Sequence, residues 1–251
     1  MPKDLPISSY KAYIASQFQT QDDEFAVEQR LPFVTISRKA GAGGITIGEK
    51  LCEYLRQHDK NAKTCPWTVF DKNLVEQVIK DHNLPEKVAR FMSEDKMNEV
   101  EDILEELFRI HPSKWTLVHK TTQTILHLAE MGHVILVGRG ANVITRKLTY
   151  GFHVRLVGSI SNRIEYMMEK FHLSEKQAIH VIKKRDQGRE NYLKKYFGKD
   201  IDDPLLYDLV INTDHISCEN AAQFIGEAVL NLAKTMPSQK IIHDTYSANL
   251  I

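Results

Sequence analysis

A short apolar strand that runs directly into a cluster of glycines is the feature that most narrows the fold. Residues Phe33–Ser37 form a β-branched, apolar run, and Gly41-Ala-Gly-Gly44 follows it closely. Ile47, Leu51 and Leu55 then recur at the four-residue spacing of a helix. Glycines at a strand-to-helix turn let backbone N–H groups wrap a phosphate, and the N-terminal end of the helix favours its negative charge. The same glycines also suit a tight turn that binds nothing, so the motif by itself leaves both interpretations open.

Further apolar runs of strand length follow, with helical patterns between them. The strands are predicted at Trp67–Phe70, His133–Val137, Phe152–Val157 and Tyr207–Asn212. Helices are predicted over 86–109, over 115–131 with an end at Gly132, from a capping box at Ser174–Gln177 to about 196, and from about 219 onward. Strands that alternate with helices pair in parallel through right-handed crossovers. We therefore predict an α/β three-layer fold, in which helices cover both faces of a five-stranded parallel sheet.

The composition restricts the class of protein. Lys plus Arg and Asp plus Glu number 33 each, so no global charge favours nucleic acid or an anionic membrane as a partner. No apolar stretch approaches the roughly 18 residues of a membrane helix, and the N-terminus lacks the apolar core of a signal peptide. The 3 cysteines are scattered, which argues against a disulfide framework and a zinc site. We expect a cytoplasmic protein without a metal-ligand cluster, and the sequence leaves the oligomeric state open, a homo-oligomer included.

The chain divides into one domain and two ends. We interpret 1–30 as an N-terminal extension with a loosely docked helix, 31–236 as the domain, and 237–251 as a polar C-terminal tail. Within the domain, 94–106 carries seven acids. A solvated helix face is the ordinary explanation of such a run. A purely structural interaction module that uses this acidic helix is the alternative.

The glycine cluster departs from the standard phosphate loop GxxxxGK[ST]. Alignment on that pattern puts Arg38 at the first glycine and Gly44 at the lysine. We expect Arg38, or else Lys39, to supply the charge that the lysine would have carried, and Thr46 to offer its hydroxyl to a metal-bound phosphate. The candidate phosphate-binding residues are Ser37, Lys39, Gly41, Ala42, Gly43, Gly44, Ile45 and Thr46.

Two further candidates lie where predicted strands end. Asp71 closes the second strand, where its carboxylate could orient or deprotonate an acceptor hydroxyl. Capping of a helix that starts near Asn73 is the structural alternative for Asp71. Arg139 lies in Val137-Gly-Arg-Gly140, where a guanidinium can contact a phosphate with two N–H groups. A structural pairing of Arg139 with a carboxylate explains it equally well.

The segment Lys183–Arg189 is the third candidate. Arg185 and Arg189 are i,i+4 neighbours on the predicted helix, so both reach the same place, and their repulsion favours an anion or an acid between them. Asp186 is the acid that can position them. A loop at Gly198–Pro204 follows, so we predict a mobile, arginine-bearing lid over about 183–203. A solvated basic face is the alternative.

These segments, in their order and spacing, resemble the cytidylate kinase-like family, whose members are relatives of the nucleoside monophosphate kinases. The resemblance runs from about 33 to 235. It is carried by ISRKAGAGGITI at 36–47, FDK at 70–72, VGRG at 137–140, LSEKQA at 173–178, KKRDQGRENYLKKYFG at 183–198 and YDLVINT at 207–213.

The resemblance implies a P-loop kinase-type fold with a helical acceptor and lid region, ATP and Mg²⁺ as cofactors, and phosphoryl transfer to a nucleotide or other small acceptor. It carries phosphate binding onto Arg139, Arg185 and Arg189. Together with the reasoning on the residues above, the predicted catalytic residues are Arg38, Asp71, Arg185 and Arg189, and the predicted acceptor-binding residues are Asp71, Arg139 and Asp186. The chain departs from the family pattern at Gly44, which replaces the lysine, and at Val137, where cytidylate kinases have the Asp of Asp-Gly-Arg. A catalytically inactive nucleotide-binding or regulatory protein on a kinase scaffold is therefore the alternative.

Overall fold

The computed structural model describes residues 30–63, 65–71 and 116–235, together with Tyr13, Val100, Ile103, Leu104 and Leu107. The strands are β1 (Phe33–Arg38), β2 (Thr68–Phe70), β3 (Val134–Val137), β4 (Gly151–Val157) and β5 (Leu209–Asn212). The helices are α2 (Gly44–His58), α6 (Thr116–Met131), α7 (Ala141–Ile144), α8 (Ile160–Phe171), α9 (Glu175–Phe197) and α10 (Cys218–Thr235), with short 3-10 helices η1 (Lys60–Lys63) and η2 (Pro204–Leu206).

The strands form one parallel sheet in the order β2-β3-β1-β4-β5. β1 lies at its centre, because Val34 pairs with Ile135 of β3 on one side and with Phe152 of β4 on the other. A strand that is covered on both faces requires apolar, β-branched residues, and the first four residues of β1 are almost fully buried. The predicted five-stranded parallel sheet is confirmed. Only the ends of the strands differ from the prediction, by one or two residues.

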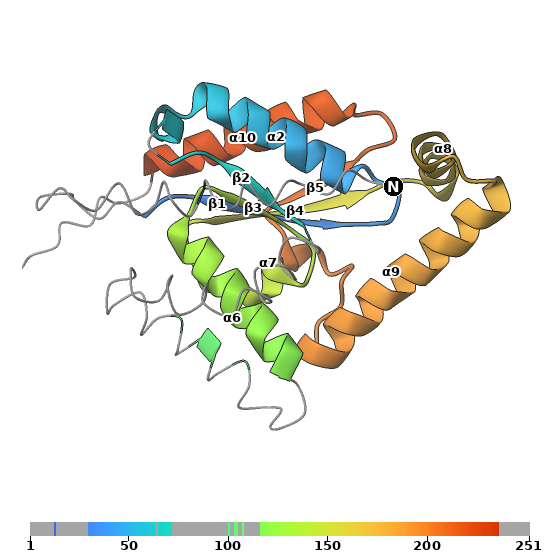
Figure 1. The fold of residues 1–251 in the computed structure, drawn as a ribbon, viewed down its shortest axis with the longest axis horizontal. Coiled ribbons are helices and arrows are strands. Elements are labelled where there is room, and N and C mark those ends of the chain that lie inside the picture. The colour runs from blue at the N-terminus through green and yellow to red at the C-terminus, as the bar shows by residue number, and fades with distance from the viewer. Residues whose placement is uncertain are drawn as a thin grey trace, which may run out of the picture.

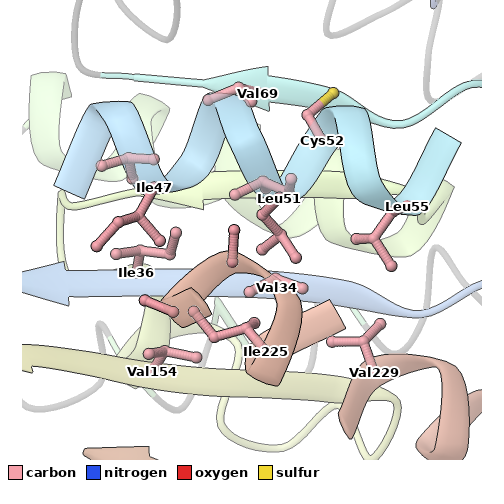
Figure 2. Close-up of a cluster of buried hydrophobic side chains, with 14 of the residues drawn as sticks. Val34, Ile36, Ile47, Leu51, Cys52, Leu55, Val69, Val154, Ile225 and Val229 are labelled. Atoms are coloured by element: carbon pink, nitrogen blue, oxygen red, sulfur yellow. The ribbon is translucent and has the colours of Figure 1, made fainter. Parts of the chain in front are cut away.

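Helices cover both faces of the sheet, which confirms the three-layer architecture. α2 and α10 pack side by side on one face, while α6 and α7 lie on the other (Figure 1). Leu51 and Leu55 of α2 meet Val34 of β1 and Ile225 and Val229 of α10 in a fully buried cluster (Figure 2). This packing fixes the start of α2 directly above the carboxyl end of β1, where the glycine loop lies.

Two helices extend from the carboxyl edge of the sheet. α8 and α9 lie beyond the ends of the strands in Figure 1. The side chain of Ser159 caps α8, which the sequence analysis did not single out. The predicted capping box between Ser174 and Gln177 is confirmed at the start of α9. α9 ends at Gly198 in a left-handed conformation, φ 64°, and Leu193 near that end packs with Val143 of α7.

Some predictions fall on residues outside the described part of the chain. These are the helix proposed for 1–30, most of the helix over 86–109, the helix after Asn73 that Asp71 would cap, and the tail at 237–251. Among the helices that the structure does describe, none combines the length and the apolarity needed to cross a bilayer.

Candidate functional site

The glycine loop joins β1 to α2 across the carboxyl end of the sheet. The amide of Lys39 still donates to the carbonyl of Leu156, at 2.9 Å, and the chain then turns through Gly41 and Gly43, whose φ angles are +84° and +71°. A Cβ atom on Gly41 would lie only 2.6 Å from the carbonyl oxygen of Arg163 on α8. Glycine is therefore required at position 41 by the backbone conformation and by the close approach of α8.

The side chain of Arg38 runs from the end of β1 across two glycines. A Cβ atom on Gly44 would lie 2.7 Å from Cγ of Arg38, and one on Gly138 would lie 2.0 Å from its Nη1. The aliphatic stem of Arg38 thus occupies the space that a side chain at 44 would fill, and its guanidinium occupies the space that a side chain at 138 would fill. Burial, and next the charge of Arg189, lower the pKa of Arg38 to about 9, although Asp71 opposes this shift.

The turn after β3 has a strained backbone. Gly138, Arg139 and Gly140 are consecutive and all left-handed, with φ angles of 91°, 58° and 72°. A non-glycine residue in this region costs about 1–2 kcal/mol. Such strain is typical of sites where a side chain must be held in one direction, and Arg139 lines the cleft described below.

Asp186 connects α9 to the glycine loop and to α8. Its Oδ1 accepts from the amide of Ala40 at 2.7 Å, and its Oδ2 accepts from Nη1 of Arg163 at 2.6 Å. Nη1 of Arg189 lies 3.3 Å from Oδ1 of Asp186 and donates to the carbonyl of Arg38 at 3.1 Å. Asp186 therefore holds Arg189 and the glycine loop together, and it does not line the cleft.

These elements surround a cleft of about 740 Å³ at the carboxyl edge of the sheet. Its walls bring together residues from the glycine loop, the ends of β2 and β3, and α9, which are the segments that carry the predicted site residues. The predicted site residues that line it are Ser37, Arg38, Lys39, Gly41, Gly43, Gly44, Ile45, Asp71, Arg139, Arg185 and Arg189. Ala42 and Thr46 do not line it, and the Thr46 hydroxyl lies 3.0 Å from the hydroxyl of Tyr166.

The cleft is strongly basic. Six cationic side chains line it, from Arg38, Lys39, Arg139, Lys184, Arg185 and Arg189. Among the described residues of its lining, Asp71 supplies the single carboxylate. Such an arrangement favours a polyanion such as a nucleotide phosphate chain. No group of three or more His, Cys, Asp or Glu residues that could hold a metal ion occurs in the described part of the chain.

The sequence analysis missed a buried network beneath the loop. Arg155 of β4, 3% exposed, donates from Nη1 to Oγ of Ser37 at 2.8 Å and from Nη2 to Oδ1 of Asp202 at 2.7 Å. Nζ of Lys39 donates to Oδ2 of the same carboxylate at 2.9 Å. Burial raises the pKa of Asp202, but the hydrogen bonds from Lys39 and Arg155 outweigh it and lower the pKa overall. A lone arginine in an apolar strand was the available signal, because a buried charge requires a partner.

The comparisons with known proteins agree with this geometry. A family model described as the cytidylate kinase-like family matches residues 33–215. The cytidylate kinase of Methanocaldococcus jannaschii is 23% identical over 167 residues, which cover 64% of this chain and 92% of that protein. The cytidylate kinase of Pyrococcus horikoshii is 26% identical over 166 residues, 66% of this chain and 83% of that protein. The crystal structure of an uncharacterised protein from Eubacterium ventriosum has the same fold, with a TM-score of 0.61 and 20% identity over 80% of this chain and 98% of that one.

Proposed function

The chain belongs to the cytidylate kinase-like family, and we propose that it transfers a phosphoryl group from ATP to a nucleoside monophosphate or a similar small acceptor. Family membership supports a function of the nucleotide-kinase type. One observation carries the finer proposal, which is that the glycine loop, Arg38 of β1, Arg139 in the turn after β3 and the arginines of α9 line the same cleft. Phosphoryl transfer depends mainly on positioning and on neutralising charge, which such a cleft can provide.

The walls of the cleft suggest distinct roles. The backbone at Gly41–Gly44 and the N-terminal end of α2 hold the phosphates of ATP, next to the charge of Arg38. Arg139 holds the phosphate of the acceptor from the strained turn after β3. Arg185 and Arg189 on α9 neutralise the charge that spreads over the transferred group. Asp71 at the end of β2 orients or deprotonates the acceptor.

A test measures ADP release from ATP in the presence of magnesium and a panel of nucleoside monophosphates. We expect one acceptor to raise ADP release well above the rate with ATP alone. The Arg139→Ala variant should raise KM for that acceptor and leave ATP affinity unchanged. Arg146→Ala is the matched control, since Arg146 lies shortly after α7, is exposed and does not line the cleft.

A nucleotide-binding protein without transferase activity is the second candidate. Gly44 in place of the lysine and Val137 in place of the metal-organising acid favour it. ATP binding by calorimetry without ADP release on any acceptor would support this candidate against the transferase. Absence of both binding and turnover would contradict both candidates.

A further inference from the structure

We propose that the cleft binds the phosphates of its nucleotide without a divalent cation, because the Arg38 guanidinium is the resident cation of the site. The inference rests on the proposed nucleotide site, and it concerns how the phosphate charge is neutralised. Magnesium is what the family resemblance implies, so the residues that would hold the ion are the first point to test.

In the described part of the cleft, the glycine loop lacks the hydroxyl that usually binds magnesium, and Asp71 is the one carboxylate. Mg²⁺ prefers oxygen ligands in octahedral geometry, and phosphate loops supply a Ser or Thr hydroxyl after the lysine together with a nearby carboxylate. Ile45 stands at the hydroxyl position of this loop and offers no oxygen from its side chain. The neighbouring Thr46 hydroxyl is engaged with Tyr166 at 3.0 Å. Asp186 accepts from Ala40 and Arg163 and lies outside the lining of the cleft.

The side chain of Arg38 passes close to the backbone at Gly44 and at Gly138. Its Cγ passes within 2.7 Å of the Cβ position at Gly44, where the standard loop has its lysine. Its Nη1 lies 2.0 Å from the Cβ position at Gly138, which follows the strand end where the family pattern has an acid. Arg38 therefore accounts for the glycine at 44, while the acid of the family pattern is replaced at Val137, whose side chain packs in the buried cluster beneath α2. Neither a lysine at 44 nor a larger residue at 138 fits unless Arg38 moves away.

The charge balance favours the guanidinium over an added ion. Asp71 is the one carboxylate in the described lining, and its charge acts directly on Arg38. A dication placed near Asp71 would therefore also face Arg38. With a pKa lowered to about 9 by burial, Arg38 remains protonated at neutral pH. Lys39 and Arg189 are paired with Asp202 and Asp186, so the net positive charge of the cleft comes from Arg38, Arg139, Lys184 and Arg185 against Asp71, and it suits a triphosphate that carries no metal.

Calorimetry of the full chain with ATP tests the inference. We expect the Kd in excess EDTA to match the Kd in excess magnesium chloride within about threefold. Binding that is tenfold or more tighter with magnesium overturns the inference and leaves the proposed function standing. Absence of ATP binding in both buffers overturns the proposed site and this inference with it.

Variants identify the cation. Arg38→Ala should weaken ATP binding in EDTA by about 10- to 100-fold, the range expected when one or two charged hydrogen bonds are lost. Arg146→Ala should bind as the parent does. If Arg38→Ala does not fold, Arg38→Lys retains a charge in a smaller head group and should show a smaller loss of affinity. ATP affinity in EDTA that is unchanged by either Arg38 substitution would overturn the inference.

Discussion

Restoring the lysine of a standard phosphate loop should harm this protein. In Gly44→Lys, the new Cβ would lie 2.7 Å from Cγ and 3.2 Å from Cδ of Arg38, inside the ordinary contact distance of about 3.5–4.0 Å. Overpacking of this kind costs about 1–3 kcal/mol, and replacing a helical glycine returns up to about 1 kcal/mol. We expect a net loss of about 1–2 kcal/mol in the free energy of unfolding, together with weaker ATP binding because the guanidinium is displaced.

A double-mutant cycle isolates the contact. Arg38→Gly removes the obstruction, so Arg38→Gly/Gly44→Lys should recover stability relative to the sum of the single changes, with a coupling of about 1–3 kcal/mol. Urea denaturation and ATP calorimetry on the four proteins measure it. Gly188→Lys is the matched control for the urea measurement alone, because a Cβ on this exposed glycine of α9 meets nothing within 4 Å but the residue lines the cleft. Additive effects, or a Gly44→Lys protein that binds ATP more tightly than the parent, would refute the reasoning.

Burial lowers the pKa of His127 to about 4, so the stability that neutral His127 contributes is complete above about pH 6.5 and is lost as the pH falls toward 4, about 3 kcal/mol in all. His127→Leu should therefore show a shallower acid loss of unfolding free energy than the exposed control His180→Leu, and parallel profiles would contradict this. Arg139→Gly should be more stable in urea than Arg139→Ala by about 1 kcal/mol because φ is positive, and the reverse order would argue against the left-handed turn. Arg189→Ala should lower kcat far more than ATP affinity, and hydrogen exchange over 183–203 should slow when nucleotides bind. Equal exchange in both states with kinetics like those of the parent would exclude a lid.

The fold could be predicted because its signals are local. β-branched runs such as Val134–Val137 locate strands that are buried on both faces, and alternation with helices then implies parallel pairing. The capping box at Ser174 is likewise contained within four residues. α8 gave a weaker signal, because its largely polar sequence buries only Met167 and its cap, Ser159, comes only two residues after the end of β4.

The site could be predicted only as a set of residues. Parallel strands end at one edge of a sheet, so Arg38, Asp71 and Arg139 could be expected to lie near one another from their places after strands. The path of the Arg38 side chain over Gly44 and Gly138 could not be predicted, because it depends on three segments that meet only in the folded chain. The same holds for Asp202, whose partners Lys39 and Arg155 lie 163 and 47 positions away.

The departures from the phosphate-loop pattern therefore have a common physical cause. In the sequence, Arg38 in place of a glycine and Gly44 in place of the lysine look like the loss of a phosphate site. In the structure, the side chain of Arg38 occupies the space beside Gly44, so one cationic side chain replaces another. The exchange has an energetic consequence. Because folding lowers the pKa of Arg38 to about 9, the folded state holds this charge unfavourably at every pH below about 9. Desolvation and the neighbouring Arg189, Arg155 and Arg185 cause the penalty, and an anion among these guanidiniums would offset it. Phosphate binding should thus offset this penalty, so the affinity for an anion and the free energy of unfolding both depend on the charge of Arg38.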